Sequence, residues 1–184
     1  MVESPPSTPA LSAHLARLGV TLPVGARGEI GLAAVDWTRV AARRLRRGFL
    51  LLIDYGHEAR ELYSASHAGG TLTTFAEHRA AGAEAATPDW LDDPGGRDIT
   101  AHVDFTSVRD AAEAEGCTTI GFLDQTYFLM GLVDLARLDS PERRRAFTTL
   151  IMPGGLGSTM KVLILGKNVG TPRLRGCASG MRVT

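Results

Sequence analysis

The chain has 184 residues, enough for one domain with a sizeable core, and its apolar and charged fractions of 44% and 22% are ordinary for a globular protein. Its 20 basic and 20 acidic residues cancel, so no global field favours binding to nucleic acid or to an anionic membrane. No apolar stretch approaches the roughly 20 residues of a membrane span, and Met1–Pro9 lacks the pattern of a signal peptide. We therefore expect a cytoplasmic protein without nucleic-acid or membrane partners.

Residues 3–48 predict a helical lead-in. A first helix, capped by Ser7 or Thr8, is expected to end at Gly19. Asp36 predicts the cap of a second helix, because a short polar side chain precedes a helical apolar pattern. The predicted buried side of that second helix comprises Trp37, Val40, Ala41 and Leu45.

Residues 49–57 form an apolar run, Phe49–Ile53, that ends in polar residues. An apolar strand without alternation is typical of a parallel strand covered on both faces. In open α/β sheets, ligands bind at the carboxyl ends of such strands. We therefore predict a strand here and expect functional residues near Asp54, Tyr55 and His57.

The rest of the chain predicts a long loop or insertion, a helical region with two more strands, and a flexible tail. A loop as long as residues 58–97 inside a compact domain is usually functional or mobile. The fold class is α/β, in a single partial domain over residues 1–184. The helical region spans residues 98–170, and the flexible tail spans residues 171–184. Within the helical region we expect a helix opened by Asp104 or Thr106, a strand over Cys117–Leu123, a helix from Thr126 to Leu138, a helix from Ser140 to Leu150, and a strand over Met160–Leu165.

Two motifs invite a functional interpretation that their spacing does not support. The glycine-rich run Gly154–Lys161 lacks the Gly-Lys-Ser/Thr ending of a phosphate loop and precedes a strand, so we interpret it as a tight connection. Cys117 and Cys177 follow no metal or redox spacing.

Histidines and carboxylates gather in the middle of the chain without the spacing of a known metal motif. We therefore predict no metal site and regard a metal-dependent hydrolase as the least favoured function. The residues of this group are Asp54, His57, Glu58, His67, Glu77, His78, His102 and Asp104.

Three blocks, Gly48–His57, Asp98–Thr106 and Ile151–Lys167, together resemble the MidA-like class I S-adenosylmethionine-dependent methyltransferases, whose mitochondrial members assist respiratory complex I assembly. The resemblance implies a Rossmann-like seven-stranded sheet in the order 3-2-1-4-5-7-6, with strand 7 antiparallel. The three predicted strands would be strands 5, 6 and 7. The family's glycine-rich cofactor loop and its ribose-binding acidic residue follow strands 1 and 2, which match nothing in this sequence. The resemblance therefore implies the C-terminal half of the domain, with the N-terminal cofactor-binding half absent and no cofactor-binding residue in this chain.

The implied activity is methyl transfer from S-adenosylmethionine to a protein, with arginine as one option, and the fragment alone is expected to be inactive and to bind the cofactor weakly or not at all. Carboxylates and aromatic rings suit a guanidinium substrate. As plain alternatives, Asp54 would end the strand by bonding backbone N–H groups, Tyr55 would be core, and Asp104 would cap a helix. The candidate substrate-binding residues are Asp54, Tyr55, His57, His102, Asp104 and Gln125.

A non-catalytic interaction module is the alternative function. Without strand 4, the strand at residues 49–57 would have an unpaired apolar edge, which favours strand addition. The partner would be a separate chain that supplies the cofactor-binding half, or a second copy of this chain. The catalytic residues and the methyl acceptor stay open.

Overall fold

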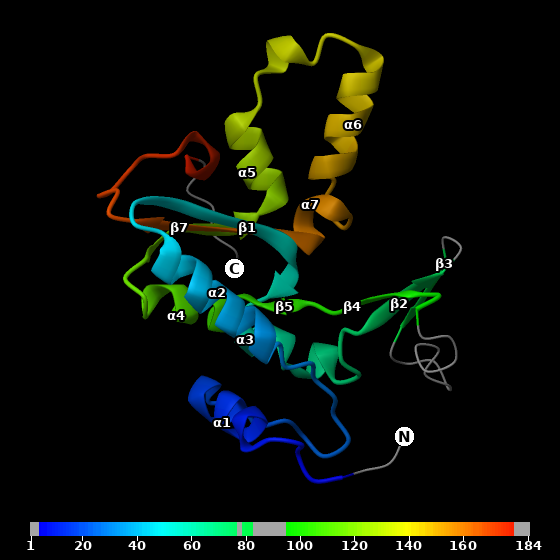
Figure 1. Cartoon of the computed structure of the whole chain (residues 1–184). Coiled ribbons are helices and arrows are strands. Elements are labelled where there is room, and N and C mark those ends of the chain that lie inside the picture. Colours follow the sequence, from blue (N-terminus) through cyan, green and yellow to red (C-terminus); the bar gives the residue numbers. More distant parts are fainter. Residues whose placement is uncertain (1–3, 77–78, 83–94, 179–184) are drawn as a thin grey trace. The chain divides into compact units, whose positions relative to one another are not determined.

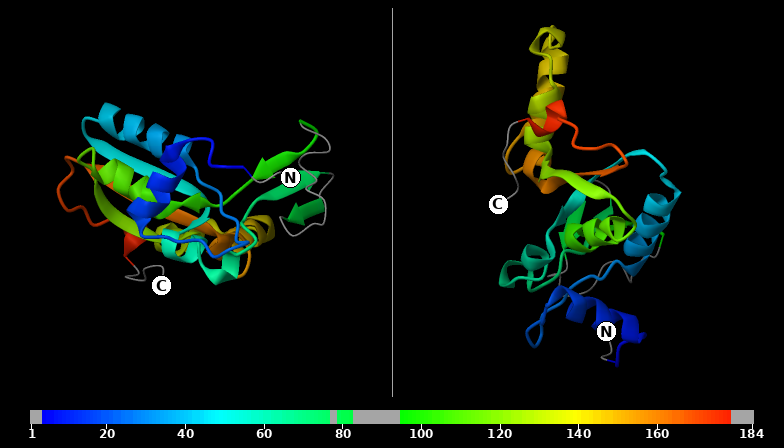
Figure 2. Two further views of the ribbon diagram at one scale, coloured as in Figure 1. Left: turned by 90° about the horizontal axis from the view of Figure 1, so that it is seen from below. Right: turned by 90° about the vertical axis from the view of Figure 1, so that its left-hand side faces the viewer.

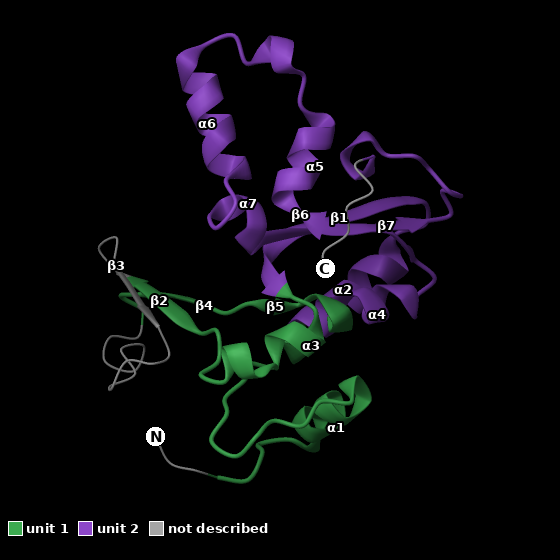
Figure 3. Cartoon of the chain, turned by 180° about the vertical axis from the view of Figure 1, so that it is seen from behind, with its two compact units in different colours: residues 1–33, 57–107 green, residues 34–56, 108–184 purple. Residues whose placement is uncertain are grey.

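The computed structural model describes residues 4–76, 79–82 and 95–178 (Figure 1). The chain divides into two compact units, where the sequence predicted a single partial domain. One unit comprises residues 1–33 and 57–107, and the other comprises residues 34–56 and 108–184 (Figure 3).

The sheet of the second unit contains β1 (Gly48–His57), β7 (Met160–Lys167) and β6 (Thr118–Asp124), side by side in that order. β7 runs antiparallel to both neighbours, with Leu51 opposite Ile164 on one side and Phe122 opposite Leu163 on the other. This is the order and direction that the resemblance implied for strands 5, 7 and 6.

Helices cover both sides of this sheet (Figures 1 and 2). The central strand β7 is accordingly buried on both faces: Val162–Leu165 are at most 3% exposed. Val162 and Ile164 pack with Leu123 against residues of α5 and of the C-terminal segment. On one side lie α5 (Gln125–Leu132) and α7 (Leu156–Thr159), and on the other lie α2 (Leu32–Arg44) and α4 (Phe105–Glu113). The helix α6 (Pro141–Ile151) packs against α5 and α7 and projects away from the sheet.

One face of β1 is exposed, so the prediction of a parallel strand covered on both faces is wrong for this chain. Phe49, Leu51 and Ile53 are 45%, 49% and 42% exposed. Directly opposite residues of an antiparallel pair point to the same face. Leu51 and Ile53 therefore share the face of Ile164 and Val162, but the cover that buries β7 leaves β1 open.

The helix α2 begins at Leu32, so the prediction that Asp36 caps it is wrong. Asp36 lies one turn inside the helix and pairs with Arg39 at 2.7 Å. The predicted buried side is wrong as well: Trp37 and Val40 are exposed, and Ala41 and Leu45 are only partly buried. The buried residues are Val35, Thr38 and Ala42, which follow a three- and four-residue spacing but are not the largest apolar side chains.

Sequence signals placed other helix ends correctly. Thr8 caps α1 (Pro9–Leu18) by accepting from the Ala10 N–H, and Gly19 ends it at φ +66°. Ser140 caps α6 in the same manner. The predicted helix to Leu138 is instead α5 to Leu132, followed by the short 3-10 helix η3 (Leu135–Arg137), because Val133 is extended.

The predicted loop 58–97 contains regular structure, which corrects the prediction for its described residues. A short helix and a 3-10 helix follow β1, and a three-stranded antiparallel sheet in the order β3-β2-β4 follows them. Glu77 and His78 lie outside the described residues. The elements are α3 (Ala59–Leu62), η1 (Ala65–His67), β2 (Thr73–Ala76), β3 (Arg79–Gly82), β4 (Asp98–Thr100) and the two-residue strand β5 (Val103–Asp104).

The C-terminal segment is packed over its described part. The 3-10 helix η4 (Arg175–Cys177) lies against α5, and Leu174 and Cys177 contact the core residues Leu123, Val162 and Ile164. Residues 171–178 of the predicted flexible tail therefore belong to the second unit. No described helix has both the length and the apolar character needed to cross a membrane.

Candidate functional site

Charged side chains form a row across one end of the sheet of the second unit. Lys161, near the start of β7, lies opposite Asp54 of β1 and Asp124 of β6. The Lys161 Nζ donates to Asp124 Oδ1 at 2.5 Å and to the Ser158 carbonyl at 2.8 Å, and the lysine is buried. Asp54 is exposed, and its Oδ1 accepts from the Tyr55 backbone N–H at 2.8 Å. The lysine charge is thus used by Asp124, and no ion pair of the described residues involves Asp54.

Two further candidates lie in the same unit. Tyr55 is half-buried on β1. Gln125 is buried at the start of α5, and its Nε2 donates to the Leu150 carbonyl at 2.8 Å. This bond ties α5 to the end of α6 and uses one of the two amide donors of Gln125.

Asp104, in the first unit, belongs to a buried polar cluster. Its Oδ1 accepts from the Ser107 backbone N–H at 3.1 Å, which is the geometry of a helix cap at the start of α4. Its Oδ2 accepts from Ser107 Oγ at 2.5 Å and lies 3.5 Å from His14 Nε2. Arg17 donates to the same Ser107 hydroxyl at 2.9 Å. The capping alternative for Asp104 is therefore observed. Sequence reasoning missed His14, which sits in an amphipathic helix without any motif.

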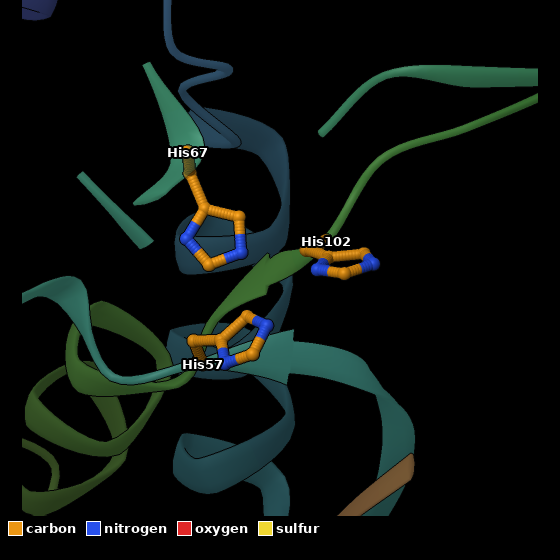
Figure 4. Close-up of side chains that lie close together, drawn as sticks. All are labelled: His57, His67 and His102. Carbon is orange, nitrogen blue, oxygen red and sulfur yellow. The ribbon is translucent and has the colours of Figure 1, made fainter. Parts of the chain in front are cut away.

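Three histidines of the first unit converge from separate elements (Figure 4). His57 ends β1, His67 ends η1, and His102 lies between β4 and β5. One ring nitrogen from each lies within 4.8 Å of the others. The ring centroids are 4.8 Å apart for His57–His67, 5.1 Å for His57–His102 and 6.3 Å for His67–His102.

This grouping unites two of the substrate-binding candidates, His57 and His102, with a residue outside that set, His67. The sequence marked His67 only as one of many mid-chain histidines and carboxylates. The intervals of 10 and 35 residues between these histidines match no metal motif, so the signal became visible only through the fold.

The glycine-rich run forms the tight connection that the sequence predicted, and both cysteines lie in packed surroundings. A side chain at Gly157 would lie 2.5 Å from the backbone of Ile151, so the chain needs glycine for close approach there, and Gly154 has φ +76°. Burial raises the pKa of both Cys117 and Cys177, which disfavours the thiolate form of each.

Comparison with known proteins adds a family to this geometry. The family described as "Putative S-adenosyl-L-methionine-dependent methyltransferase" matches residues 1–123. A Drosophila melanogaster protein named protein arginine methyltransferase NDUFAF7 homolog, mitochondrial, is 31% identical over an alignment of 137 residues that covers 67% of this chain and 28% of that protein.

Two solved structures from Burkholderia thailandensis are also similar. One, described as a candidate methyl transferase bound to S-adenosyl-homocysteine, has a TM-score of 0.80 and 28% identity over 96% of this chain and 46% of its own. The other, described as an uncharacterised protein of the same superfamily, has a TM-score of 0.74 and 29% identity over 91% of this chain and 45% of its own.

The chain therefore spans less than half the length of each of these relatives. The family match covers more than half of the chain, and the structural likeness covers nearly all of it. The family match contains two of the three sequence blocks, Gly48–His57 and Asp98–Thr106, and the structural likeness extends over the third. The chain belongs to the MidA-like family of S-adenosylmethionine-dependent methyltransferases.

Proposed function

We propose that this chain is the substrate-binding part of a methyltransferase that modifies a protein, with an arginine side chain as the methyl acceptor. The cofactor of the family is S-adenosylmethionine. In this proposal a segment outside the chain, continuous with it or separate, supplies the cofactor-binding half of the domain. The cytoplasmic location expected from the sequence stays a prediction.

The exposed carboxylate of Asp54 is the observation that carries the proposal. It lies near the end of β1, next to a lysine whose charge is already used by Asp124. A carboxylate held beside a backbone N–H is oriented but retains acceptor capacity for the N–H groups of a guanidinium. Tyr55 follows it directly and offers an aromatic ring for the same cation.

The residues described here do not by themselves fit S-adenosylmethionine. The family's cofactor loop is glycine-rich and joins a strand to a helix. Among the described residues, α3 and α5 follow β1 and β6 without a glycine-rich turn, and the glycines of Gly154–Gly157 lie between α6 and α7 and in α7 itself, so they do not follow a strand. We therefore assign to this chain the binding and orientation of the acceptor, and derive no transfer step from it.

The test compares the chain alone with the chain coexpressed with the segment encoded upstream of Met1. Calorimetry is expected to give weak or no S-adenosylmethionine binding for the chain alone, and clear binding for the assembly. With radiolabelled cofactor, the assembly is expected to form methylarginine in protein, because holding donor and acceptor in line accelerates transfer.

Asp54→Asn should then lower methylarginine formation by at least about ten-fold while leaving cofactor affinity unchanged, because losing a charged hydrogen bond costs about 1.5–3 kcal/mol. Asp36→Asn is the matched control, since its surface pair with Arg39 contributes little. Equal activity of the two variants would remove Asp54 from the proposal. Micromolar binding of the cofactor by the lone chain would contradict the proposal that another segment supplies the cofactor-binding half.

The alternative is an interaction module without catalytic activity. The exposed apolar face of β1 favours it, because Phe49, Leu51 and Ile53 offer a contiguous apolar surface to another polypeptide. An assembly that forms with the upstream segment but neither binds the cofactor nor transfers a methyl group would support this alternative.

A further inference from the structure

We propose that His57, His67 and His102 form a binding site for one divalent transition-metal ion of the zinc class. This proposal is independent of the proposed function. It also departs from the sequence-based prediction of no metal, which rested on spacing along the chain and not on proximity in the fold.

The ligand geometry is the first argument. One nitrogen from each imidazole lies within 4.8 Å of the other two. Ligand nitrogens about 2.0–2.1 Å from a tetrahedral zinc ion are about 3.4 Å apart. Two of these nitrogens therefore have to approach each other by at most about 1.4 Å to reach that spacing. Imidazole is a preferred ligand of Zn²⁺, Co²⁺ and Ni²⁺.

A hydrogen bond to His67 is the second argument. Its Nδ1 lies 3.0 Å from the Glu61 carbonyl oxygen, which can only accept, so Nδ1 carries the hydrogen. The lone pair is then on Nε2. A metal-binding histidine usually donates its other ring N–H to a carbonyl or carboxylate in this manner, which fixes the tautomer and the ring orientation. The Glu61 carboxylate lies 3.8 Å from the same Nδ1 and adds negative charge behind the ring.

The backbone that carries the histidines is tied together, which is the third argument. The His102 backbone N–H donates to Thr71 Oγ1 at 3.0 Å, and Thr71 donates twice to Glu29 Oε2, each at 2.9 Å. The Arg27 N–H donates to the Ala68 carbonyl at 2.9 Å, which holds the end of η1 against the same segment. Ligands held by a supported backbone lose less conformational freedom on binding an ion.

The environment of the cluster suits an ion that keeps contact with solvent. All three histidines are partly buried. Three protein ligands leave a fourth position of a tetrahedral zinc ion for water or another small ligand. The site therefore has the donor set of an open zinc centre and not that of a closed structural one.

The experiment uses the full chain, purified without a polyhistidine tag and stripped with a chelator. Calorimetric titration with Zn²⁺ is expected to give one equivalent per chain. Titration with Co²⁺ is expected to give the visible absorption of a four-coordinate ion, which a loosely bound surface ion does not produce. His67→Ala should weaken binding at least about ten-fold and abolish the Co²⁺ spectrum, because it removes one of three ligands.

His14→Gln is the matched control, because it removes an imidazole that belongs to the cluster with Asp104 and Ser107 and is not among the three proposed ligands. It should leave the stoichiometry and the spectrum unchanged. His57→Ala is the second ligand variant, and circular dichroism with a thermal melt establishes that each variant folds. Failure of the folded wild-type chain to bind either ion would overturn the proposal. So would binding that His67→Ala and His14→Gln weaken equally.

Discussion

At the residue scale, Tyr63 links burial to the pH dependence of stability. Its side chain packs with Ala59 and Leu62 in the core of the first unit, and its hydroxyl donates to the Glu29 carbonyl at 3.1 Å. Burial, and then the negative charges of Asp104 and Glu29, raise the pKa of Tyr63 to about 12. The folded state therefore disfavours the tyrosinate that forms near pH 10 in the unfolded chain.

The expected consequence is a loss of stability between about pH 10 and about pH 12. Below pH 10 Tyr63 is protonated in both states, so its contribution is fully present. Above pH 10 the unfolded chain releases the proton first, which favours unfolding until the pH passes the folded pKa. Urea unfolding of wild-type and Tyr63→Phe chains across this range measures the effect.

The Tyr63→Phe chain should be less stable by about 1 kcal/mol at pH 9, because it lacks the bond to Glu29. This difference should shrink as the pH rises toward 12, because phenylalanine does not titrate. A difference that stays constant over the whole range would contradict the assignment.

At the element scale, the turn before β7 depends on one glycine. A Cβ at Gly157 would lie 2.5 Å from both the carbonyl carbon and the oxygen of Ile151, which is backbone at the end of α6 and cannot rotate away. A Cβ at Gly155 would meet nothing closer than the Met152 oxygen at 3.5 Å, and Gly155 has φ −123°. The two glycines therefore differ in steric demand although they are two residues apart.

Gly157→Ala should lower the free energy of unfolding by about 1–3 kcal/mol, because overpacking displaces neighbouring backbone. Gly155→Ala is the matched control and should change it by less than about 0.5 kcal/mol. Denaturant titration of both variants decides the matter, and equal losses would show that close approach at Gly157 is not the cause.

The sequence predicted those elements whose signals are local. Cap residues such as Thr8 and Ser140 marked helix starts, and apolar runs marked β1, β6 and β7, because these signals act within a few residues. The prediction for the buried side of α2 was wrong because it placed the large apolar side chains inside. In the structure Trp37 is exposed and the small Ala42 is buried. Short elements such as α3 and β4 carried too few residues for a periodic signal.

The residues of the candidate site were likewise predictable only where their signal is local along the chain. Asp54, Tyr55 and His57 were proposed as site residues because they end an apolar run, and their role stays a prediction. The histidine cluster was missed because it depends on contacts between distant segments, which no spacing along the chain encodes. Arg27 bonds to Ala68 beside His67, and Thr71 bonds to the backbone of His102. The resemblance to a family did supply the strand order, because it carries information on pairing between distant segments.

At the scale of the whole molecule, the sheet of the second unit has an unequal cover. The side that carries α5, α6 and α7 buries Val162 and Ile164 of β7 but leaves the neighbouring face of β1 exposed. The chain spans 46% of the similar solved chain, so that relative contains further polypeptide. In our proposal, the cofactor-binding half of the domain covers this face.

The exposed face should therefore make the lone chain self-associate, because a contiguous apolar patch without a partner favours association. Light scattering is expected to give a mass above that of one chain, which falls to the mass of a single pair when the upstream segment is coexpressed. Leu51→Lys, in the centre of the face, should reduce self-association and weaken pairing with that segment.

Leu135→Lys is the matched control: Leu135 is 73% exposed on η3, away from β1 in sequence and structure, and its replacement should change neither mass. A lone wild-type chain that stays monomeric at high concentration, or a Leu51→Lys chain that pairs as well as Leu135→Lys, would contradict the role assigned to β1.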